Sequence, residues 1–257
     1  MSIVFATSRG IGLQETLDPE YKLTTHAIPG GKLSGLRRAA EASITPLYGP
    51  RRRRQHSYFI CGIPDLTSLV KCHKEVYKEC LFLGDPEAKL EKYKTDLIDC
   101  QKSIVNRGAL PIFCTVPNMN LSIYNQHLLN KCKTKILKHS NEYQAMQENL
   151  TKTIESLNSY IFELNKEIGV STPFIHCTIS ERRGKQGKRR YVYRWDRLED
   201  GLHPPRGRGD PKLLLKKWGG IISNAERLNG SLEDSDTDED IIVKRSWKYP
   251  SKQPRVV

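Results

Sequence analysis

Short apolar runs, separated by turns rich in glycine and proline, divide the chain and predict a series of strands. Most of these runs carry β-branched or aromatic side chains. Several are apolar throughout, which is expected of a strand that is buried on both faces of a sheet. The predicted strands are residues 3–6, 22–28, 57–62, 110–116 and 173–179.

The longer segments between these runs repeat apolar residues at steps of three and four, which is the pattern of an amphipathic helix. They predict helices over residues 33–44, 86–105, 143–168 and 211–228. The third helix is the longest and ends at Gly169. Its apolar stripe fits either packing on the sheet or the seam of a coiled-coil dimer, and we favour packing within the chain.

The alternation of strands and helices predicts an α/β domain over residues 1–230. Its architecture would be a three-layer sandwich around a mainly parallel sheet. Within it, residues 182–195 predict an exposed basic hairpin or loop. Residues 231–257 lose the apolar period and are acidic, then basic, so they predict a disordered tail.

Composition indicates the size of the core and the cellular compartment expected for this domain. The 257 residues, 37% of them apolar, allow one sizeable core. No run approaches the roughly 18 to 20 apolar residues of a membrane span, and no secretory leader is visible. Seven scattered cysteines predict reduced thiols and an intracellular protein, cytoplasmic or nuclear. Their spacing predicts no metal site, and nothing indicates a cofactor.

The charge of the chain is high and unevenly distributed. A net charge of +13 favours polyanionic partners, or serves solubility. Residues 51–54 and 182–190 are basic and residues 233–240 acidic, and we favour a solvated surface for each. If nucleic acid binds, we expect the 182–190 loop to dominate through phosphate contacts and base stacking. The side chains available there are Arg189, Arg190, Tyr191 and Tyr193.

Two distant stretches hold the side chains of a nucleophilic site. In a parallel sheet, sites form beyond the carboxyl ends of the strands, and Ser8 follows the first predicted strand at that edge. A serine needs a base to become a nucleophile. Asp200 and His203, three residues apart in a predicted loop, supply a histidine and a carboxylate that can orient it. Gly30 and the backbone amides near Ser8 are candidate oxyanion donors.

Four blocks, in their order along the chain, resemble the SGNH hydrolases, the superfamily of GDSL-type esterases and lipases. They read "VFATSRG", "IPGGKLSGL", "FICGIPDLT" and "DGLHP". Residues 110–125 and 209–225 also resemble the fourth strand and closing helix of that family, so the likeness covers about residues 3–225. The resemblance implies a flavodoxin-like sheet.

The same resemblance implies roles for individual residues. Ser8 matches the nucleophile of the family, His203 the general base and Asp200 the carboxylate that orients it. Gly30 matches the oxyanion glycine, with Gly31 as the neighbouring alternative.

The chain departs from the family at two places. Ala6-Thr7 replaces the Gly-Asp that precedes the nucleophile, and Pro64 stands where the family has an oxyanion asparagine. Because proline has neither a side-chain amide nor a backbone N–H, this donor is lost. The candidate replacements are Asn118, Asn120 and Arg9.

Two functions remain open at this point. The first is a serine esterase that acts on a small carboxylic ester or a carbohydrate ester through an acyl-enzyme. The second is a weakened or inactive SGNH-like binding or scaffold protein, which Pro64 favours. Compact domains of this kind also resemble reading frames of mobile elements and viruses, which implies nucleic-acid or virion partners.

Overall fold

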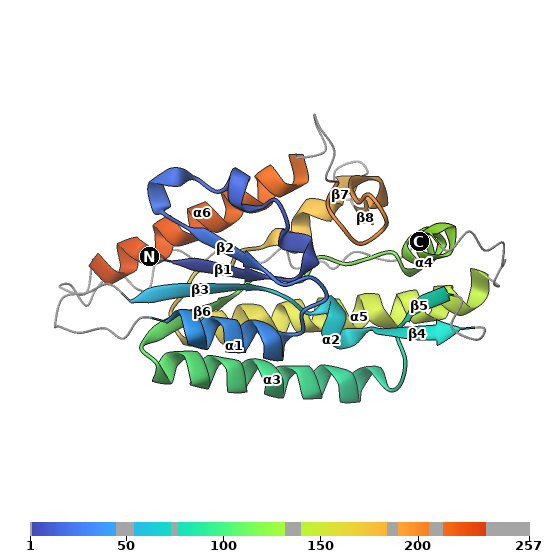
Figure 1. The fold of residues 1–257 in the computed structure, drawn as a ribbon, viewed down its shortest axis with the longest axis horizontal. Helices are drawn as coiled ribbons and strands as arrows, with labels where there is room; N and C mark the ends of the chain where they lie inside the picture. Colours follow the sequence, from blue (N-terminus) through green and yellow to red (C-terminus); the bar gives the residue numbers. More distant parts are fainter. Residues whose placement is uncertain are drawn as a thin grey trace.

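A four-stranded parallel sheet forms the centre of the protein (Figure 1). The computed structural model describes residues 2–44, 54–72, 77–131, 140–183, 190–205 and 213–234. The strands lie in the order β2-β1-β3-β6 and every neighbouring pair is parallel, so their carboxyl ends share one edge. The α/β sandwich expected from the sequence is therefore confirmed. The strands are β1 (Ile3–Ala6), β2 (Thr24–Ala27), β3 (Gln55–Ile60) and β6 (Ala109–Phe113).

Helices cover both faces of this sheet (Figure 1). One face packs on α1 (Leu33–Ser43), α3 (Pro86–Asn106) and α5 (Ser140–Glu167). The other packs on α6 (Leu213–Asp234) and on the 3-10 helix η4 (Ile175–Ile179). The short 3-10 helices η2 (Gln14–Thr16) and η3 (Pro19–Tyr21) lie against α6.

Alternate residues of the strands feed the two cores, as the period of a β-strand requires. Phe5, Phe59 and Phe113 form a row of aromatic rings on the α1–α3–α5 face, with neighbouring centroids 5.6 Å and 5.4 Å apart. On the α6 face, Tyr58 lies in the same buried cluster as Trp218. Both faces being covered explains why the central strands read as continuous apolar runs.

The long helix α5 packs within the chain, as expected. Its central stripe is buried in the core beneath the sheet, which excludes a coiled-coil seam built from the same side chains. The helix is followed by Gly169 in the left-handed conformation, with φ of 73°. The buried stripe consists of Leu150, Ile154, Leu157, Ile161 and Leu164.

The expected strand at residues 173–179 is wrong, because Ile175–Ile179 forms the 3-10 helix η4. The outer edge of β6 therefore has no neighbouring strand, and asparagines of α5 take its place. The side chain of Asn165 accepts from the N–H of Phe113 at 3.1 Å and donates to its carbonyl at 2.8 Å. Asn158, two turns earlier, makes the same pair of bonds to Val116, at 2.6 Å and 3.0 Å.

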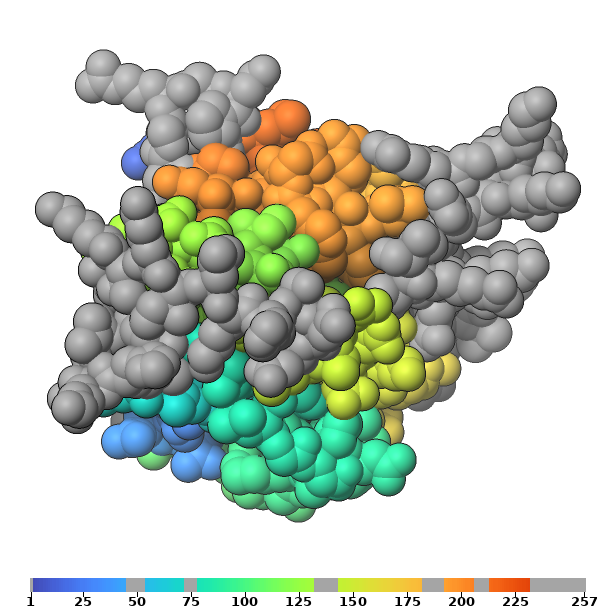
Figure 2. Space-filling model, turned by 90° about the vertical axis from the view of Figure 1, so that its right-hand side faces the viewer, coloured from blue at the N-terminus to red at the C-terminus, as the bar shows by residue number. Residues whose placement is uncertain are grey.

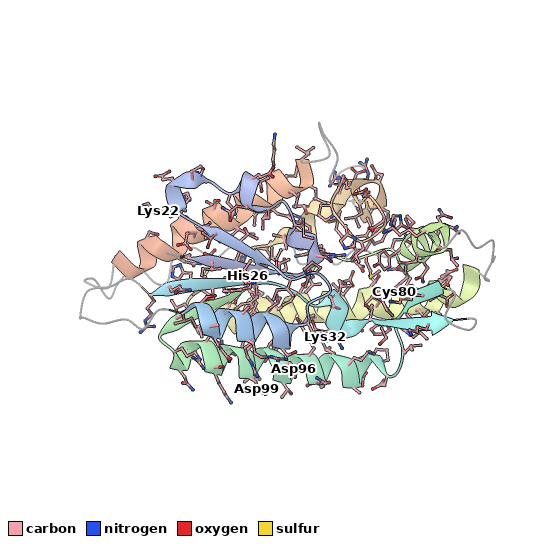
Figure 3. All side chains as sticks on the ribbon, viewed as in Figure 1. Lys22, His26, Lys32, Cys80, Asp96 and Asp99 are labelled. Carbon is pink, nitrogen blue, oxygen red and sulfur yellow. The ribbon has the colours of Figure 1, made fainter. Side chains whose placement is uncertain are left out.

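Two helices and a hairpin on the carboxyl side of the sheet were not predicted from the sequence. They are the short helix α2 (Ile63–Leu66), the antiparallel hairpin of β4 (Ser68–Cys72) and β5 (Tyr77–Leu81), and helix α4 (Leu121–Lys131). The hairpin docks on α4 by the same device as β6. Asn125 accepts from the N–H of Cys80 at 2.7 Å and donates to its carbonyl at 2.9 Å (Cys80 is labelled in Figure 3).

The carboxyl-terminal third begins with the hairpin that the sequence suggested. It is formed by β7 (Ser180–Arg183) and β8 (Arg190–Tyr193). Helix α6 runs to Asp234, so the first four residues of the expected tail are helical. The rest of that tail, residues 235–257, lies outside the described residues. No helix in the described part of the chain is long and apolar enough to cross a membrane.

We predict that Asn165→Leu lowers the free energy of unfolding by about 2–4 kcal/mol, because the buried N–H and carbonyl of Phe113 lose their partner. Urea denaturation measures this. The matched control is Asn149→Leu on the exposed face of the same helix, for which we expect a change within about 0.5 kcal/mol. Equal effects at the two positions would show that the amide does not close the strand edge.

Candidate active site

Ser8 lies directly beyond the carboxyl end of β1, in the one-turn 3-10 helix η1 (Ser8–Gly10). The N–H of Thr7 donates to the carbonyl of Ile60 at 3.1 Å and continues the pairing of β1 with β3. A Cβ added at Gly10 would lie 2.2 Å from the Cβ of Ala6, so only glycine allows this tight turn after the strand. The turn leaves the Ser8 side chain half-buried at the sheet edge.

Asp200 builds the loop that carries His203. Its Oδ1 accepts from the backbone N–H groups of Leu202, at 3.0 Å, and His203, at 2.8 Å, in an Asx turn. The N–H of Glu199 donates to the carbonyl of His203 at 2.8 Å and closes the loop. The local sequence therefore fixes the histidine relative to the carboxylate before any contact with Ser8.

Gly201 anchors this loop to α4. Its φ is 78°, and an added Cβ would lie 2.8 Å from the carbonyl oxygen of Asn120 and 2.9 Å from the Cβ of Ile123. The N–H of Asn120 also donates to the carbonyl of Gly201 at 2.8 Å. Backbone conformation and close packing both require glycine here.

The two stretches, 195 positions apart in sequence, meet in one hydrogen-bonded chain. Ser8 Oγ lies 2.9 Å from His203 Nε2, and His203 Nδ1 lies 2.7 Å from Asp200 Oδ2. An ionised carboxylate can only accept, so Nδ1 carries the proton in the neutral imidazole. Nε2 is then the acceptor for the Ser8 hydroxyl.

Asp200 remains ionised over the ordinary pH range. Burial raises the pKa of its carboxyl group, but the bonds from the ring and the amide of His203 and from the amide of Leu202 outweigh burial. Together they hold that pKa well below its usual range. The side chain of His203 is 15% exposed, so a small molecule can reach the ring.

Arg9, next to Ser8, points into the protein. It is 4% exposed, and its guanidinium donates to the carbonyl oxygens of Pro117 and, at 3.0 Å, Asn118. Burial lowers the pKa of Arg9 to about 9, while the charge of Asp200 and the hydroxyl of Tyr124 act in the opposite direction. The arginine therefore ties the serine turn to the end of β6, which differs from the expected role as an oxyanion donor.

The expected asparagine donors are also engaged elsewhere. The side-chain amide of Asn118, 2% exposed, donates to Thr151 Oγ1 at 2.8 Å and accepts from the N–H of Met119 at 2.9 Å. Asn120 accepts from the N–H of Ile123 at 2.9 Å and thereby caps the start of α4. Both asparagines stabilise the segment after β6.

The glycine turn after β2 uses the N–H of Gly31 and not that of Gly30. The N–H of Gly31 donates to the carbonyl of Ile28 at 3.0 Å and closes a turn with Pro29 and Gly30 at its centre. Gly30 has a φ of 67°, as the third position of a type II turn requires. This turn does not use the N–H of Gly30, which remains a candidate oxyanion donor.

Pro64 and Asp65 lie in α2, beyond the carboxyl end of β3. Asp65 accepts from the N–H of Leu33 through Oδ1 at 3.1 Å and Oδ2 at 3.2 Å, and so caps α1 rather than its own segment. Burial raises the pKa of Asp65 to about 6, partly offset by the bond from Leu33 and the nearby charge of Lys32.

Sequence reasoning missed two side chains of α4 that face the Asp200 loop. The ring of Tyr124 lies 6.1 Å from that of His203, centroid to centroid, and Nε2 of His127 lies 3.8 Å from Asp200 Oδ2. Figure 2 shows the green segment that contains α4 directly below the orange segment that contains this loop. Tyr124 and His127 are three residues apart and share one helix face, which was the available signal. No helix was predicted there.

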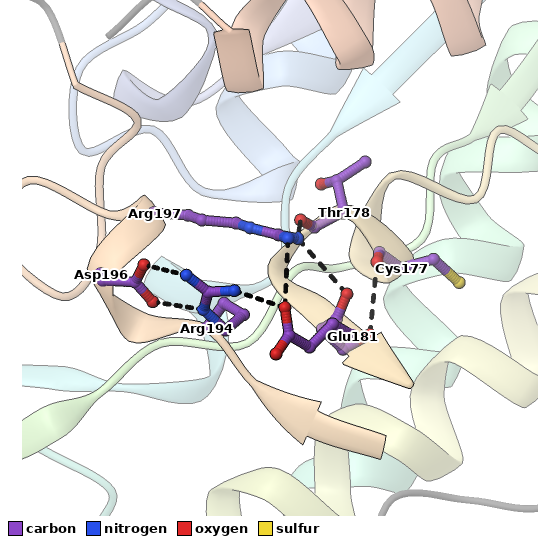
Figure 4. A network of polar contacts seen from close by, with 7 residues as sticks. Cys177, Thr178, Glu181, Arg194, Asp196 and Arg197 are labelled. Atoms are coloured by element: carbon purple, nitrogen blue, oxygen red, sulfur yellow. Dashed lines mark hydrogen bonds and ion pairs between the residues drawn. The ribbon is translucent and has the colours of Figure 1, made fainter. Parts of the chain in front are cut away.

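The basic hairpin lies outside this chain of bonds. Residues 184–189 and the side chains of Arg190 and Tyr191 are outside the described part of the structure. In the segment that follows β8, Arg194 bonds to Glu181 of β7 and to Asp196, and Arg197 lies 3.7 Å from Glu181 (Figure 4).

Tyr193 is partly buried and its side chain contacts other residues of the protein. Its hydroxyl donates to Glu155 at 3.1 Å, and its ring stacks on Trp195 with centroids 4.8 Å apart. One face of the Tyr193 ring is therefore covered by Trp195, and a base could not stack on that face.

The described residues hold no group of three histidine, cysteine or acidic side chains arranged for a metal ion. The thiols whose surroundings are described are free, and most are buried in the two cores. They are Cys61, Cys80, Cys100, Cys114 and Cys177.

Comparison with solved structures places this geometry on a known fold. No protein-family model and no curated protein matches the chain. A GDSL-like lipase from Bacteroides thetaiotaomicron superimposes with a TM-score of 0.51 at 11% identity, over 88% of this chain and 87% of that one. A protein assigned as an acylhydrolase from Bacteroides fragilis gives 0.52 at 9% identity, over 88% and 86%.

A protein assigned to the lipolytic G-D-S-L family, from Desulfitobacterium hafniense, gives a TM-score of 0.50 at 11% identity, over 87% of this chain and 98% of that one. At such identities the likeness concerns the backbone, and the expected flavodoxin-like sheet agrees with it. The chain therefore has the fold of the SGNH, or GDSL, hydrolases.

Proposed function

We propose that this protein is a serine ester hydrolase in which Ser8 is the nucleophile, His203 the general base and Asp200 the carboxylate that orients it. The observation that carries the proposal is the unbroken series of contacts at 2.9 Å and 2.7 Å from the hydroxyl through the imidazole to an ionised carboxylate. It joins loops that are distant in sequence and lies at the sheet edge where α/β proteins form their sites.

The reaction follows from this arrangement. Ser8 Oγ attacks the carbonyl carbon of the ester while its proton passes to His203 Nε2. The alcohol leaves with that proton and an acyl-enzyme remains. Water then attacks the acyl group, gives a proton to Nε2 and releases the acid, after which the proton returns to Ser8 Oγ. Asp200 stabilises the imidazolium that forms in each half of the cycle.

Backbone amides supply the oxyanion donors in this proposal. Ser8 and Arg9 begin a 3-10 turn whose first internal bond is donated by Gly10, so the turn leaves their N–H groups unused. The N–H of Gly30 lies in the loop after β2, the strand next to β1. With proline at position 64, the site has one donor fewer than the family pattern has.

The second candidate is an SGNH-like binding or scaffold protein without hydrolytic activity. The engagement of Asn118 and Arg9 inside the protein favours it, because neither compensates for Pro64. Loss of one oxyanion donor costs roughly a hundred- to a thousand-fold in rate, which leaves a slow enzyme rather than none. A small carboxylic or carbohydrate ester remains the proposed substrate, and nucleic-acid or virion partners and a mobile-element or viral setting remain predictions.

We predict that a fluorophosphonate probe labels the wild-type protein at Ser8 and does not label Ser8→Ala. Hydrolysis of a small ester such as p-nitrophenyl acetate should fall to the background rate in the same variant. Ser34→Ala, an exposed serine on α1, is the control and should keep both. Equal labelling of wild type and Ser8→Ala would end the hydrolase proposal and favour the binding protein.

Restoring the family residue tests the missing donor. We predict that Pro64→Asn raises kcat for a small ester by roughly ten- to a hundred-fold, since a single oxyanion donor contributes up to about a thousand-fold when its geometry is ideal. KM should change little, because the added bond forms in the transition state. The control is Pro64→Ala, which removes the proline ring without adding a side-chain donor. Equal rates in the two variants would show that this position does not face the oxyanion.

Removing the carboxylate tests the role of Asp200. We predict that Asp200→Asn lowers kcat/KM at pH 7 by about a thousand- to ten-thousand-fold, since an amide lets the imidazole adopt the wrong tautomer. Asp196→Asn, whose side chain is 61% exposed, is the control and should change little. An activity close to wild type in Asp200→Asn would contradict the assigned role.

The same variant has a pH signature in stability. The folded-state pKa of Asp200 is depressed, so its contribution to the free energy of unfolding is complete above roughly pH 4 and shrinks as pH falls below that. Urea unfolding at pH 7 and pH 3 should therefore show a smaller difference between wild type and Asp200→Asn at pH 3. A larger difference at pH 3 would contradict the depressed pKa.

A further inference from the structure

A second imidazole lies beside the carboxylate of the candidate site. Nε2 of His127 is 3.8 Å from Asp200 Oδ2, the same oxygen that lies 2.7 Å from Nδ1 of His203. The side chain of His127 is 33% exposed, so its ring can exchange protons with water. One carboxylate oxygen thus stands between two histidines.

The placement of His127 is fixed by its helix. The start of α4 is tied to the Asp200 loop by the bond from Asn120 to Gly201, and its middle is tied to β5 by the paired bonds of Asn125 to Cys80. The green segment that contains α4 and the orange segment that contains the Asp200 loop also lie side by side in Figure 2. The approach of His127 to Asp200 is therefore built into the docking of α4.

The other ionisable groups beside Asp200 keep their charge state near neutral pH. From η1, Arg9 has a pKa of about 9 and stays charged below that. On α4, burial raises the pKa of Tyr124 to about 12, and the electrostatic effects of Cys80 and Asp200 act in the same direction. From β5, burial raises the pKa of the Cys80 thiol, so neither Tyr124 nor Cys80 ionises near neutral pH.

Further charged groups on the neighbouring elements include Glu79, Glu199 and Lys131. On β5 and α5, on which α4 packs, Glu79 accepts a bond from the hydroxyl of Tyr143 at 3.1 Å. Glu199, which precedes Asp200, and Lys131, one turn beyond His127, are both exposed. Histidine is the side chain whose ordinary titration falls between about pH 5 and 8.

The sign of the effect follows from the shared oxygen. Protonated His127 forms an ion pair with Asp200 and offsets part of its negative charge. That charge is what favours the imidazolium form of His203, so a cation at position 127 lowers the proton affinity of His203. With a neutral side chain at position 127, the negative charge of Asp200 acts on His203 alone. The proton affinity of His203 is then higher.

We propose that His127 is a positioning residue of this site, a second imidazole on Asp200 whose charge sets how readily His203 takes up a proton. Its importance for turnover rests on the proposed function, because the proton affinity of His203 governs catalysis only if His203 is the general base. The electrostatic link itself does not depend on turnover and is measured without a substrate.

The test is an NMR titration of the His203 imidazole in the full-length wild-type protein and in a charge series at position 127. His127→Gln should raise the titration midpoint of His203 by roughly 0.5 pH unit, and His127→Lys should lower it by a similar amount, as expected for a charge a few ångströms away near the surface. Both shifts should shrink in 1 M salt, where the screening length falls to about 3 Å.

The matched control is Lys131→Gln, which removes a full positive charge one helical turn further along α4. It should move the midpoint of His203 by less than about 0.2 pH unit, because screening weakens exposed charges that are further away. Unshifted midpoints in both His127 variants would overturn the proposal. Shifts of the same sign in the two variants would also overturn it, because packing rather than charge would then be the cause.

Activity separates this inference from the proposed function. If Ser8-dependent hydrolysis is present, the acid limb of kcat/KM should move with the NMR midpoint in both variants. If Ser8 proves inert while the opposite shifts of His127→Gln and His127→Lys are observed, the link between His127 and His203 stands and the hydrolase proposal falls.

Discussion

The outer edge of β6 is the constraint on which the rest of the molecule depends. A buried strand edge without a partner leaves N–H and carbonyl groups unpaired, at a cost of about 1–3 kcal/mol for each. Asn158 and Asn165 remove that cost by bonding to two residues of the strand segment. They fix the end of β6, whose following carbonyls hold the guanidinium of Arg9 beside Ser8. The position of the serine is thereby linked to a strand on the far side of β3.

The amide device recurs where the second half of the site is built. Asn125 closes the edge of β5 on α4, and Asn120 joins the start of α4 to the loop of Asp200. The helix that carries Tyr124 and His127 is therefore held by a side-chain amide at β5 and by a backbone N–H at the Asp200 loop. An asparagine can copy one residue of a neighbouring strand, since its side chain carries the same donor and acceptor as a peptide group. In this protein such residues substitute for strands that the sheet lacks.

Local patterns were enough to predict most of the sheet and the long helices. The repeat of apolar residues and the turn residues that mark these elements can be read within a short stretch of sequence. They also singled out Ser8, Asp200 and His203, since Asp200 and His203 make a local turn and Ser8 follows a clear strand, and their catalytic roles stay a prediction. The closure of β6 could not be predicted in this way. The amide of Asn165, eight or more residues before this segment, occupies the N–H and carbonyl of Phe113 that a strand at residues 173–179 would use, and residues 175–179 form a 3-10 helix instead. Helix α4 carries the polar Asn125 among its buried residues, so its apolar period is interrupted and no helix was predicted around Tyr124 and His127.

Asp200 is the electrostatic centre of the site. Buried Arg9 acts on it from the serine turn, His127 approaches one of its oxygens at 3.8 Å, and His203 holds the same oxygen at 2.7 Å. Each of these groups favours the ionised carboxylate. A positive charge on any one of them offsets part of the negative charge of Asp200 and so weakens its electrostatic stabilisation of the other two. In a site with Asp200 and His203 alone, the histidine would receive the full effect of the charge. Under the proposed function and the proposed role of His127, the charges carried by η1 and α4 bear on how readily His203 takes up a proton, and the docking of α4 becomes part of the chemistry of the site.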